Sequence, residues 1–347
     1  MEDASIPYLG LLAGGIAFGG IATYALAGVY AERKVSAFIQ DRLGPMETGP
    51  KGLFQTAADI LKLLMKEHIV PSAADKILFA IAPLLVFLSV FAGFSAIPFA
   101  PGLVTAPLNA GLLFVLAIIS IEVVGILMAG WGSNNKYALI GAVRSVSQII
   151  SYEIPAALAL LSAIVMTGTL DLQIIGMQQD GEWGLLHWNA IRYPHLIPAF
   201  LIYFTAILAE TNRAPFDLPE AESELIAGFH TEYSGFRFAL FMLAEYANML
   251  LLSILAVLVF FGAWHSPIPD IPGMPDLSGH SVLIWISGAG WLLGKSLFLV
   301  ILMMWIRWTL PRVRPDQLMV ICWKYLVPVG LGLIFISAIW QLVRIYT

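Results

Sequence analysis

The stretch LNAGLLFVLAIISIEVVGILMAG, from Leu108 to Gly130, decides the fold class of this chain. Its only ionisable residue is Glu122, and an apolar run of about 20 residues is long enough to cross a bilayer as a helix. The rest of the chain has the same character, since 59% of its 347 residues are hydrophobic and only 12% are charged. With a mean hydropathy of +0.84, this composition excludes a soluble domain. We therefore predict an all-α integral membrane protein, in which residues 1–347 form a single polytopic membrane domain.

Seven other apolar runs of similar length accompany this stretch. The first begins after Glu2 and Asp3 instead of a basic segment and continues too long for a signal-peptide core, so we expect it to remain as a helix. The eight transmembrane helices predicted in this way are Tyr8 to Tyr30, Lys76 to Ile97, Leu108 to Gly130, Ala138 to Met166, Leu196 to Asn212, Phe236 to Trp264, Val282 to Trp308 and Leu318 to Val343.

Lysine and arginine lie almost entirely on one side of this eight-helix topology. Fifteen of the eighteen fall in or next to the loops that follow the first, third, fifth and seventh spans. Only Arg192 and Arg344 fall on the opposite side, and Lys295 lies within a span. Because basic loops stay in the cytoplasm, we predict that both termini lie outside.

The segment from Pro50 to His68, between the first and second spans, has the pattern of an amphipathic helix. Its apolar residues recur at helical spacing, whereas Asp59, Lys62 and Lys66 lie away from that stripe. We predict that this helix lies in the membrane interface. Asp59 and Lys62, three residues apart, would pair along one wall of an entrance to a site at the membrane surface. The alternative is a surface helix that is anchored by its basic side chains.

Few ionisable residues lie inside the predicted spans. Each would be costly if it faced lipid, so we expect them to face one another or a wetted interior. Four carboxylates and one lysine, spread over five helices, indicate a polar axis along which protons could be exchanged. The alternative is a set of static packing pairs, for example Glu245 with Lys295. The residues of this axis are Glu122, Glu153, Glu210, Glu245 and Lys295.

The segment AETNRAPFDLPEAESEL, from Ala209 to Leu225, extends the axis into the following loop. It places Arg213 and five carboxylates at the end of an apolar span, and we predict an acidic loop over residues 213–235 on the cytoplasmic side. Close carboxylates repel one another, which raises some of their pKa values and suits a proton reservoir. A solvated acidic loop is the alternative, but it explains poorly the apolar residues threaded among the acids. The carboxylates are Glu210, Asp217, Glu220, Glu222 and Glu224.

Motifs for redox cofactors and metals are missing from the sequence. It contains no Gly-x-Gly-x-x-Gly motif and no complete Gly-x-x-x-x-Gly-Lys-Ser/Thr phosphate loop, and its single cysteine, Cys322, cannot hold an iron–sulfur cluster. The histidines lack the spacing of metal ligands. We therefore predict no metal site and no redox cofactor on this chain. Any electron transfer would take place on a partner or on a diffusible lipid-soluble carrier.

Several long motifs, in the same order along the chain, resemble those of one family. They are Glu32-Arg33-Lys34, Asp41-Arg42-Leu43-Gly44-Pro45 followed by Gly49-Pro50-Lys51-Gly52-Leu53-Phe54-Gln55, the string from Glu210 to Leu225, and Pro311-Arg312-Val313-Arg314-Pro315-Asp316-Gln317-Leu318-Met319. They look like the signatures of the quinone-chamber H subunit of bacterial NADH:quinone oxidoreductase, respiratory complex I, whose mitochondrial counterpart is called subunit 1. The resemblance covers essentially the whole chain.

The resemblance implies a membrane subunit that joins the membrane arm to the peripheral arm and forms much of the quinone tunnel. The first span, the amphipathic helix and the sixth span would frame the tunnel mouth. Positions that match the family near this cavity are Arg33, Arg42, Asp59, Lys62, Phe216, Asp217, Phe229 and Arg307. Quinone, for example ubiquinone, would be the substrate, while flavin and iron–sulfur clusters would belong to partner subunits. No residue would be catalytic on this chain alone.

The same resemblance implies an acidic path that leads from the cavity toward the proton-pumping subunits. Glu153, Glu210, Glu220, Glu222, Glu224 and Glu245 match this path, and Lys295 also matches the family. Together with Glu122 and Arg213 from the reasoning above, these residues form the predicted proton path. The expected partners are the other membrane-arm and peripheral-arm subunits, quinone and membrane lipid, with no nucleic acid.

Two other classes of function stay open at this point. One is the anchor subunit of a related membrane-bound nickel–iron hydrogenase. The complete basic loop after the first span favours a quinone enzyme over this class. The other is an autonomous proton-coupled carrier, although the chain lacks matching interrupted halves. A bacterial inner membrane with periplasmic termini is favoured over a mitochondrial inner membrane by the length of the chain and its acidic N-terminal segment.

Overall fold

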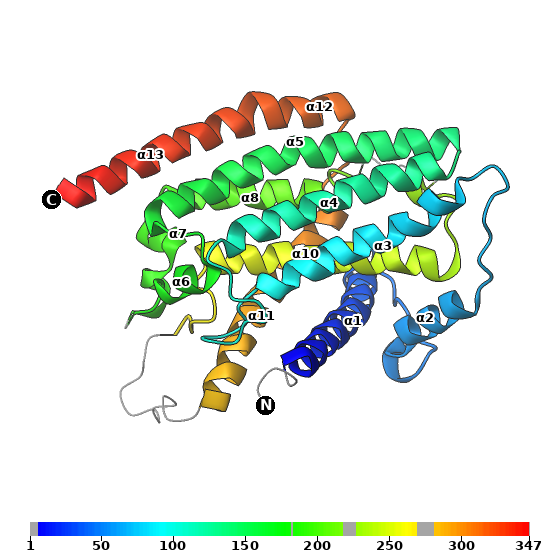
Figure 1. The fold of residues 1–347 in the computed structure, drawn as a ribbon, viewed down its shortest axis with the longest axis horizontal. Helices are drawn as coiled ribbons and strands as arrows, with labels where there is room; N and C mark the ends of the chain where they lie inside the picture. The colour runs from blue at the N-terminus through cyan, green and yellow to red at the C-terminus, as the bar shows by residue number, and fades with distance from the viewer. Residues whose placement is uncertain (1–5, 182, 218–226, 269–280, 347) are drawn as a thin grey trace.

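The computed structural model describes residues 6–181, 183–217, 227–268 and 281–346, and these residues form helices joined by loops, without a strand (Figure 1). The prediction of an all-α protein is therefore confirmed for this part of the chain. The longer helices are α1 (Ile6–Ile39), α2 (Gln55–Met65), α3 (Lys76–Gly93), α4 (Gly111–Gly132), α5 (Lys136–Thr167), α8 (Leu196–Glu210), α10 (Gly235–Phe260), α11 (Ser281–Thr309) and α13 (Val327–Tyr346). The shorter ones are η1 (Pro50–Gly52), η2 (Phe94–Ala96), α6 (Leu172–Met177), η3 (Gly184–His187), α7 (Asn189–Arg192), η4 (Gly228–His230), α12 (Pro315–Val320) and the π-helical η6 (Ile321–Leu326).

Six helical segments of the described chain are long and apolar enough to cross a membrane: Lys76–Ala96, Gly111–Gly132, Lys136–Thr167, Gly235–Phe260, Leu283–Thr309 and Pro315–Tyr346. These six coincide with six of the eight predicted spans. The other two predicted spans coincide with α1 and with α8, which is a shorter apolar helix of 15 residues. Helix α8 ends at Glu210 because Thr211 closes its last turn and Asn212 adopts a positive φ of 49°.

Helix α10 is the centre of the bundle. It is almost wholly buried, whereas the C-terminal segment formed by α12, η6 and α13 is mostly exposed and lies along α5 (Figure 1). Helices α3 and α8 pack beside α10, α4 packs against α3 and α5, and α1 and α11 are inclined to these helices. Close approach depends on small residues: a Cβ added at Gly130 in α4 would lie 2.3 Å from the Cβ of Ala142 in α5.

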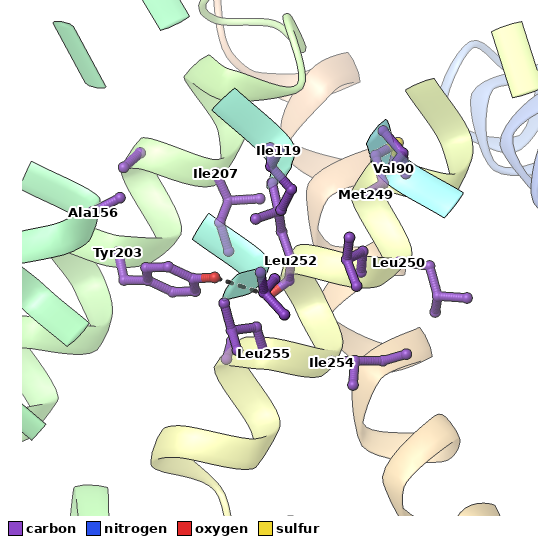
Figure 2. Packing of buried hydrophobic residues seen from close by; sticks show 14 of the residues in the cluster. Val90, Ile119, Ala156, Tyr203, Ile207, Met249, Leu250, Leu252, Ile254 and Leu255 are labelled. Atoms are coloured by element: carbon purple, nitrogen blue, oxygen red, sulfur yellow. Dashed lines mark hydrogen bonds between the residues drawn. The ribbon is translucent and has the colours of Figure 1, made fainter. Parts of the chain in front are cut away.

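The packed interior is built from branched aliphatic side chains of α4, α8 and α10. Ile119, Ile207 and Leu255 are buried there (Figure 2). The hydroxyl of Tyr203 donates a hydrogen bond of 3.3 Å to the carbonyl oxygen of Leu252 in this interior. Because a buried hydroxyl without a partner is costly, this bond fixes the register between α8 and α10.

The predicted amphipathic helix is present but shorter than the expected range of 50–68. Helix α2 begins at Gln55 because Gly49, Lys51 and Gly52 have positive φ angles of 74°, 55° and 76°. A Cβ at Gly52 would lie 2.3 Å from the carbonyl oxygen of Pro45, so this turn requires glycine. The helix stops at Met65 because Lys66 is extended.

Candidate functional site

A cavity of about 640 Å³ lies between α1, α2, α10 and α11. Most of its wall is apolar, with Ala22 and Leu26 from α1, Ile60 from α2 and Met242 from α10 among the lining residues. Five charged side chains also line it, namely Glu32, Arg33, Arg42, Asp59 and Lys62. An apolar wall with a few convergent polar groups is typical of sites that bind small amphipathic molecules.

Asp59 organises the charged groups contributed by α2. Its carboxylate lies 2.6 Å from the guanidinium of Arg33 and 3.5 Å from the ammonium of Lys62. Burial raises the pKa of Asp59, but the hydrogen bond and charge of Arg33, with smaller contributions from Lys62 and Gln55, outweigh it and lower the pKa below its usual value. Asp59 is therefore ionised at neutral pH, and it holds Arg33 against the cavity wall.

A second group of charges lies behind the cavity, where four helices or loops meet; Glu32 and Arg213 are buried, and Glu245 and Arg307 are partly buried. The guanidinium of Arg213 lies 2.7 Å from the carboxylate of Glu32 and 2.8 Å from that of Glu245. Arg307 of α11 also pairs with Glu32, and the hydroxyl of Tyr246 donates a hydrogen bond of 2.5 Å to the same carboxylate. We call these five residues the buried charge cluster.

Two members of the buried charge cluster, Glu32 and Tyr246, also line the cavity. The guanidinium of Arg213 lies 4.8 Å from the centre of the Tyr246 ring, within the range of a cation–π contact. Burial lowers the pKa of Arg213, but the charges of Glu245 and Glu32 raise it well above its usual value. Arg213 is therefore a permanent cation at the back of the cavity.

The turn after α8 places Arg213 in this position. The amide of Gln148 in α5 donates hydrogen bonds of 2.7 Å to the carbonyl oxygen of Ala209 and 2.8 Å to that of Phe216. The backbone N–H of Arg213 donates a bond of 3.0 Å to Leu208. Because one side chain holds both ends of the turn, the arginine is directed toward α1 and α10.

A series of carboxylates continues from the cluster into the bundle. Glu122 is buried and accepts a hydrogen bond of 2.9 Å from the side-chain amide of Asn248, and it is close enough to Glu245 and Glu210 for their charges to interact. Glu210, also buried, interacts in the same way with Glu153, whose carboxylate accepts a hydrogen bond from the hydroxyl of Ser120. Arg213 thus joins Glu32 and Glu245 by ion pairs. Glu122, Glu210 and Glu153 lie near enough to this group or to one another for their charges to interact.

Comparison with known proteins decides the family of this chain. The family model described as NADH dehydrogenase matches residues 14–338. The H subunit of NADH-quinone oxidoreductase from Chlorobium luteolum is 55% identical, over 93% of this chain and 86% of that protein. The H subunits from Chlorobaculum parvum and Phocaeicola vulgatus are 56% and 48% identical, over 92% and 89% of this chain and over 89% and 84% of those proteins. The chain belongs to the family of NADH-quinone oxidoreductase H subunits.

The structure places the tunnel residues expected for an H subunit in two groups. Arg33, Arg42, Asp59 and Lys62 line the cavity, and Arg307 reaches its wall through Glu32. The remaining three lie elsewhere. Phe216 packs on Tyr152 with ring centres 5.4 Å apart, Asp217 pairs with Arg312 at 3.2 Å, and Phe229 packs on Phe241 at 5.4 Å.

The residues of the expected proton path are also divided. Glu122, Glu153, Glu210, Glu245 and Arg213 are the members that the structure describes, whereas Glu220, Glu222 and Glu224 lie outside the described residues. Lys295 does not pair with Glu245. Its ammonium donates hydrogen bonds of 2.8 and 3.0 Å to the carbonyl oxygens of Phe261 and His265, at the other end of α10.

Sequence reasoning gave no role to four residues that complete the site in this H subunit. Glu32 was seen only as part of a motif, although a carboxylate directly after an apolar run is a usable signal. Asn248 lies three residues after Glu245, on the same face of α10, which could have marked it as a partner for an acid. Tyr246 and Trp308, which also line the cavity, carry no sequence signal that separates them from other aromatic residues of the spans.

Within the described ranges, no three metal-ligating side chains of His, Cys, Asp or Glu come together. Cys322 is buried, and its thiol donates a hydrogen bond of 2.9 Å to the carbonyl oxygen of Ser151.

Proposed function

We propose that this chain serves NADH:quinone oxidoreductase as the membrane subunit whose cavity admits quinone, and that the buried charge cluster connects the cavity to an acidic proton path. The observation that carries the proposal is the double position of Glu32 and Tyr246, which are at once wall residues of the cavity and members of the cluster. A molecule in the cavity would therefore contact the first groups of the carboxylate series.

The chemistry of quinone fits both parts of the cavity. The apolar wall suits an isoprenoid tail, and the charged groups at Asp59 and Arg33 suit a polar headgroup. Reduction by two electrons requires two protons, and nearby cations stabilise the anionic forms. A change of charge in the cavity would shift the protonation of Glu245, Glu122 and Glu210 in turn, because the charge of each interacts with that of its neighbour.

The membrane arrangement that goes with this function has eight spans. Helix α1, with 34 residues, is long enough to cross at an incline and to bring Glu32 and Arg33 to the inner surface. Helix α8 is roughly 22 Å long, and it would cross within the bundle because most of its residues are buried. Helix α2 would lie in the interface, since Leu61 and Leu64 are 60% and 53% exposed.

The chain would work in the inner membrane of a bacterium, with both termini on the periplasmic side. Flavin and iron–sulfur clusters would belong to peripheral-arm subunits that dock on its basic inner face, and other membrane-arm subunits would receive the acidic path. The relatives named above are subunits of NADH-quinone oxidoreductase, which favours this assembly over a hydrogenase anchor or an autonomous carrier.

Purification of the natively tagged chain in mild detergent tests the assembly. We expect it to copurify with flavin and iron–sulfur subunits and with NADH:quinone reductase activity that quinone-site inhibitors abolish. A nickel–iron partner would instead assign the chain to a hydrogenase, and a chain that is purified alone with transport activity would assign it to a carrier.

The substitution Glu210→Gln tests the acidic path. We expect the complex to assemble, because Gln has nearly the shape of Glu. Its rate of proton pumping should fall by roughly tenfold, since the loss of one proton carrier raises the barrier to proton transfer by about 1.4 kcal/mol or more. Glu47→Gln, at an exposed position, is the matched control. Pumping at the wild-type rate in an assembled Glu210→Gln complex would exclude this residue from the path.

The substitution Asp59→Asn tests the charged part of the cavity. Loss of a partly exposed ion pair worth about 0.2–1 kcal/mol should raise the KM for quinone by at most about fivefold and leave kcat unchanged. Because the pKa of Asp59 is lowered, the pair is fully formed above the ordinary pKa of Asp and is lost only as the pH falls below it. The ratio of the two KM values should therefore stay constant between about pH 6 and pH 8, and a ratio that changes in this interval would contradict the assignment.

A further inference from the structure

A second cavity, of about 390 Å³, lies at the opposite end of the bundle from the charged groups of the first. It is formed where the C-terminal ends of α5 and α13 meet the short helix α7, which Figure 1 shows at the same end of the molecule. Its wall is polar, with Thr167, Gln178, Arg192, Tyr193, Gln341 and Arg344 among the lining residues. In the predicted topology this end faces the outside.

Two arginines, Arg192 and Arg344, give this cavity a positive charge. Among lysines and arginines, the predicted topology leaves only Arg192 and Arg344 on the outer side, and the fold brings both to one tyrosine. The guanidinium of Arg344 donates a hydrogen bond of 2.9 Å to the hydroxyl of Tyr193, and that of Arg192 lies 5.5 Å from the centre of the same ring. Among the described residues neither arginine forms an ion pair, and none of the lining residues is a carboxylate.

Helix dipoles do not account for this arrangement. Each arginine lies in the last turn of its helix, where the helix dipole stabilises a cation. That effect acts on each arginine separately and gives no reason for the two to share a cavity, where like charges repel each other. Two cations that converge on one ring, in a cavity with no carboxylate among its described lining residues, suit an anion.

We propose that this cavity binds the phosphate group of an anionic phospholipid from the outer leaflet. Two guanidinium groups match the oxygens of a phosphate diester, and the Tyr193 hydroxyl, which accepts a bond from Arg344, keeps its own proton for a further phosphate oxygen. The side-chain oxygen of Gln341 is buried without a donor among the described residues, so it suits a headgroup hydroxyl.

The surroundings place this cavity at the depth of lipid headgroups. Trp340 and Trp183 are 46% and 66% exposed on the segments that flank it, and exposed tryptophans gather at the membrane interface. Both arginines are themselves exposed, so that a headgroup can enter from the side without unfolding the site. A soluble anion would leave this apolar border without a partner, whereas a lipid covers it.

Photo-crosslinking in native membranes tests the proposal on the intact complex. A photoreactive amino acid at Gln178 should form an adduct with a phospholipid. The yield should fall by at least about tenfold in the double variant Arg192→Gln and Arg344→Gln, since two charge-assisted contacts are lost. It should be retained in Arg192→Lys with Arg344→Lys. Lys136→Gln, an exposed cation at the inner surface, is the control for net charge.

A second measurement distinguishes the sources of the phosphate group. The purified complex in nanodiscs of phosphatidylglycerol should unfold at a higher temperature than in nanodiscs of phosphatidylcholine, and the difference should shrink in the double Gln variant but not in the Lys136→Gln control. Equal protection by inorganic phosphate would overturn the assignment to a lipid. A photo-adduct with a peptide of another subunit, or an adduct yield that the two Gln substitutions leave unchanged, would also overturn the proposal.

Discussion

Replacement of Ala22 by Trp is expected to lower NADH:quinone reductase activity by at least roughly tenfold, which corresponds to about 1.4 kcal/mol. Ala22 lies on the cavity-facing side of α1, and the indole would occupy space that the tail of a quinone requires. Oxidation of NADH by a water-soluble acceptor, which needs no membrane cavity, should continue at the wild-type rate. The comparison of the two activities in one preparation is the measurement.

Ala27→Trp is the matched control for this experiment. Ala27 is five residues further along α1, is exposed, and does not line the cavity. Its replacement adds the same side chain to the same helix, so it should leave both activities unchanged. If the Ala22→Trp complex reduced quinone normally, the cavity between α1, α2, α10 and α11 would not be the route of the substrate.

The substitution Arg213→Gln is expected to destabilise the subunit by about 3–5 kcal/mol, because removal of one partner leaves buried charges uncompensated. Arg213 is 3% exposed and contacts both Glu32 and Glu245. The expected result is a complex that unfolds at a clearly lower temperature, or that loses this subunit during native electrophoresis. Arg213→Lys keeps the charge but cannot contact both carboxylates. Its unfolding temperature should therefore lie between those of the wild type and Arg213→Gln.

Arg312→Gln provides the comparison for Arg213→Gln. Arg312 forms a single ion pair with Asp217 at 3.2 Å, and its side chain is 42% exposed, so its loss should cost at most about 1 kcal/mol. Both variants replace one arginine by glutamine. Equal effects of the two substitutions would mean that the buried charge cluster does not hold α1, α10 and α11 together.

The sequence predicted the parts of this molecule that depend on composition. Six helices coincide with predicted spans because lipid imposes a uniform requirement, an apolar run of sufficient length. Glu122, Glu153 and Glu210 could be chosen for a similar reason, since a carboxylate inside an apolar run is costly and must have a partner. Neither inference required knowledge of which helices are neighbours.

The parts that sequence reasoning missed depend on contacts between distant segments. Arg213 and Glu32 are 181 positions apart, and no periodicity connects them. Lys295 illustrates the same limit: its charge within a span shows that it needs partners, but not that these are the free carbonyl groups at the end of α10. A pattern identifies which groups need partners, and only the packing of the helices selects them.

The position of Glu32 and Tyr246, in the cavity wall and in the buried charge cluster at once, links two equilibria. A ligand that binds one protonation state of the cluster more tightly shifts the proton equilibrium toward that state, and the pH must then change the affinity of the ligand by the same factor. This reciprocity has no preferred direction. In the proposed function, protons that enter the carboxylate series would change the affinity of the cavity for its ligand by the same factor as the ligand changes the affinity for protons. One arrangement of side chains would then serve both quinone reduction and its reverse.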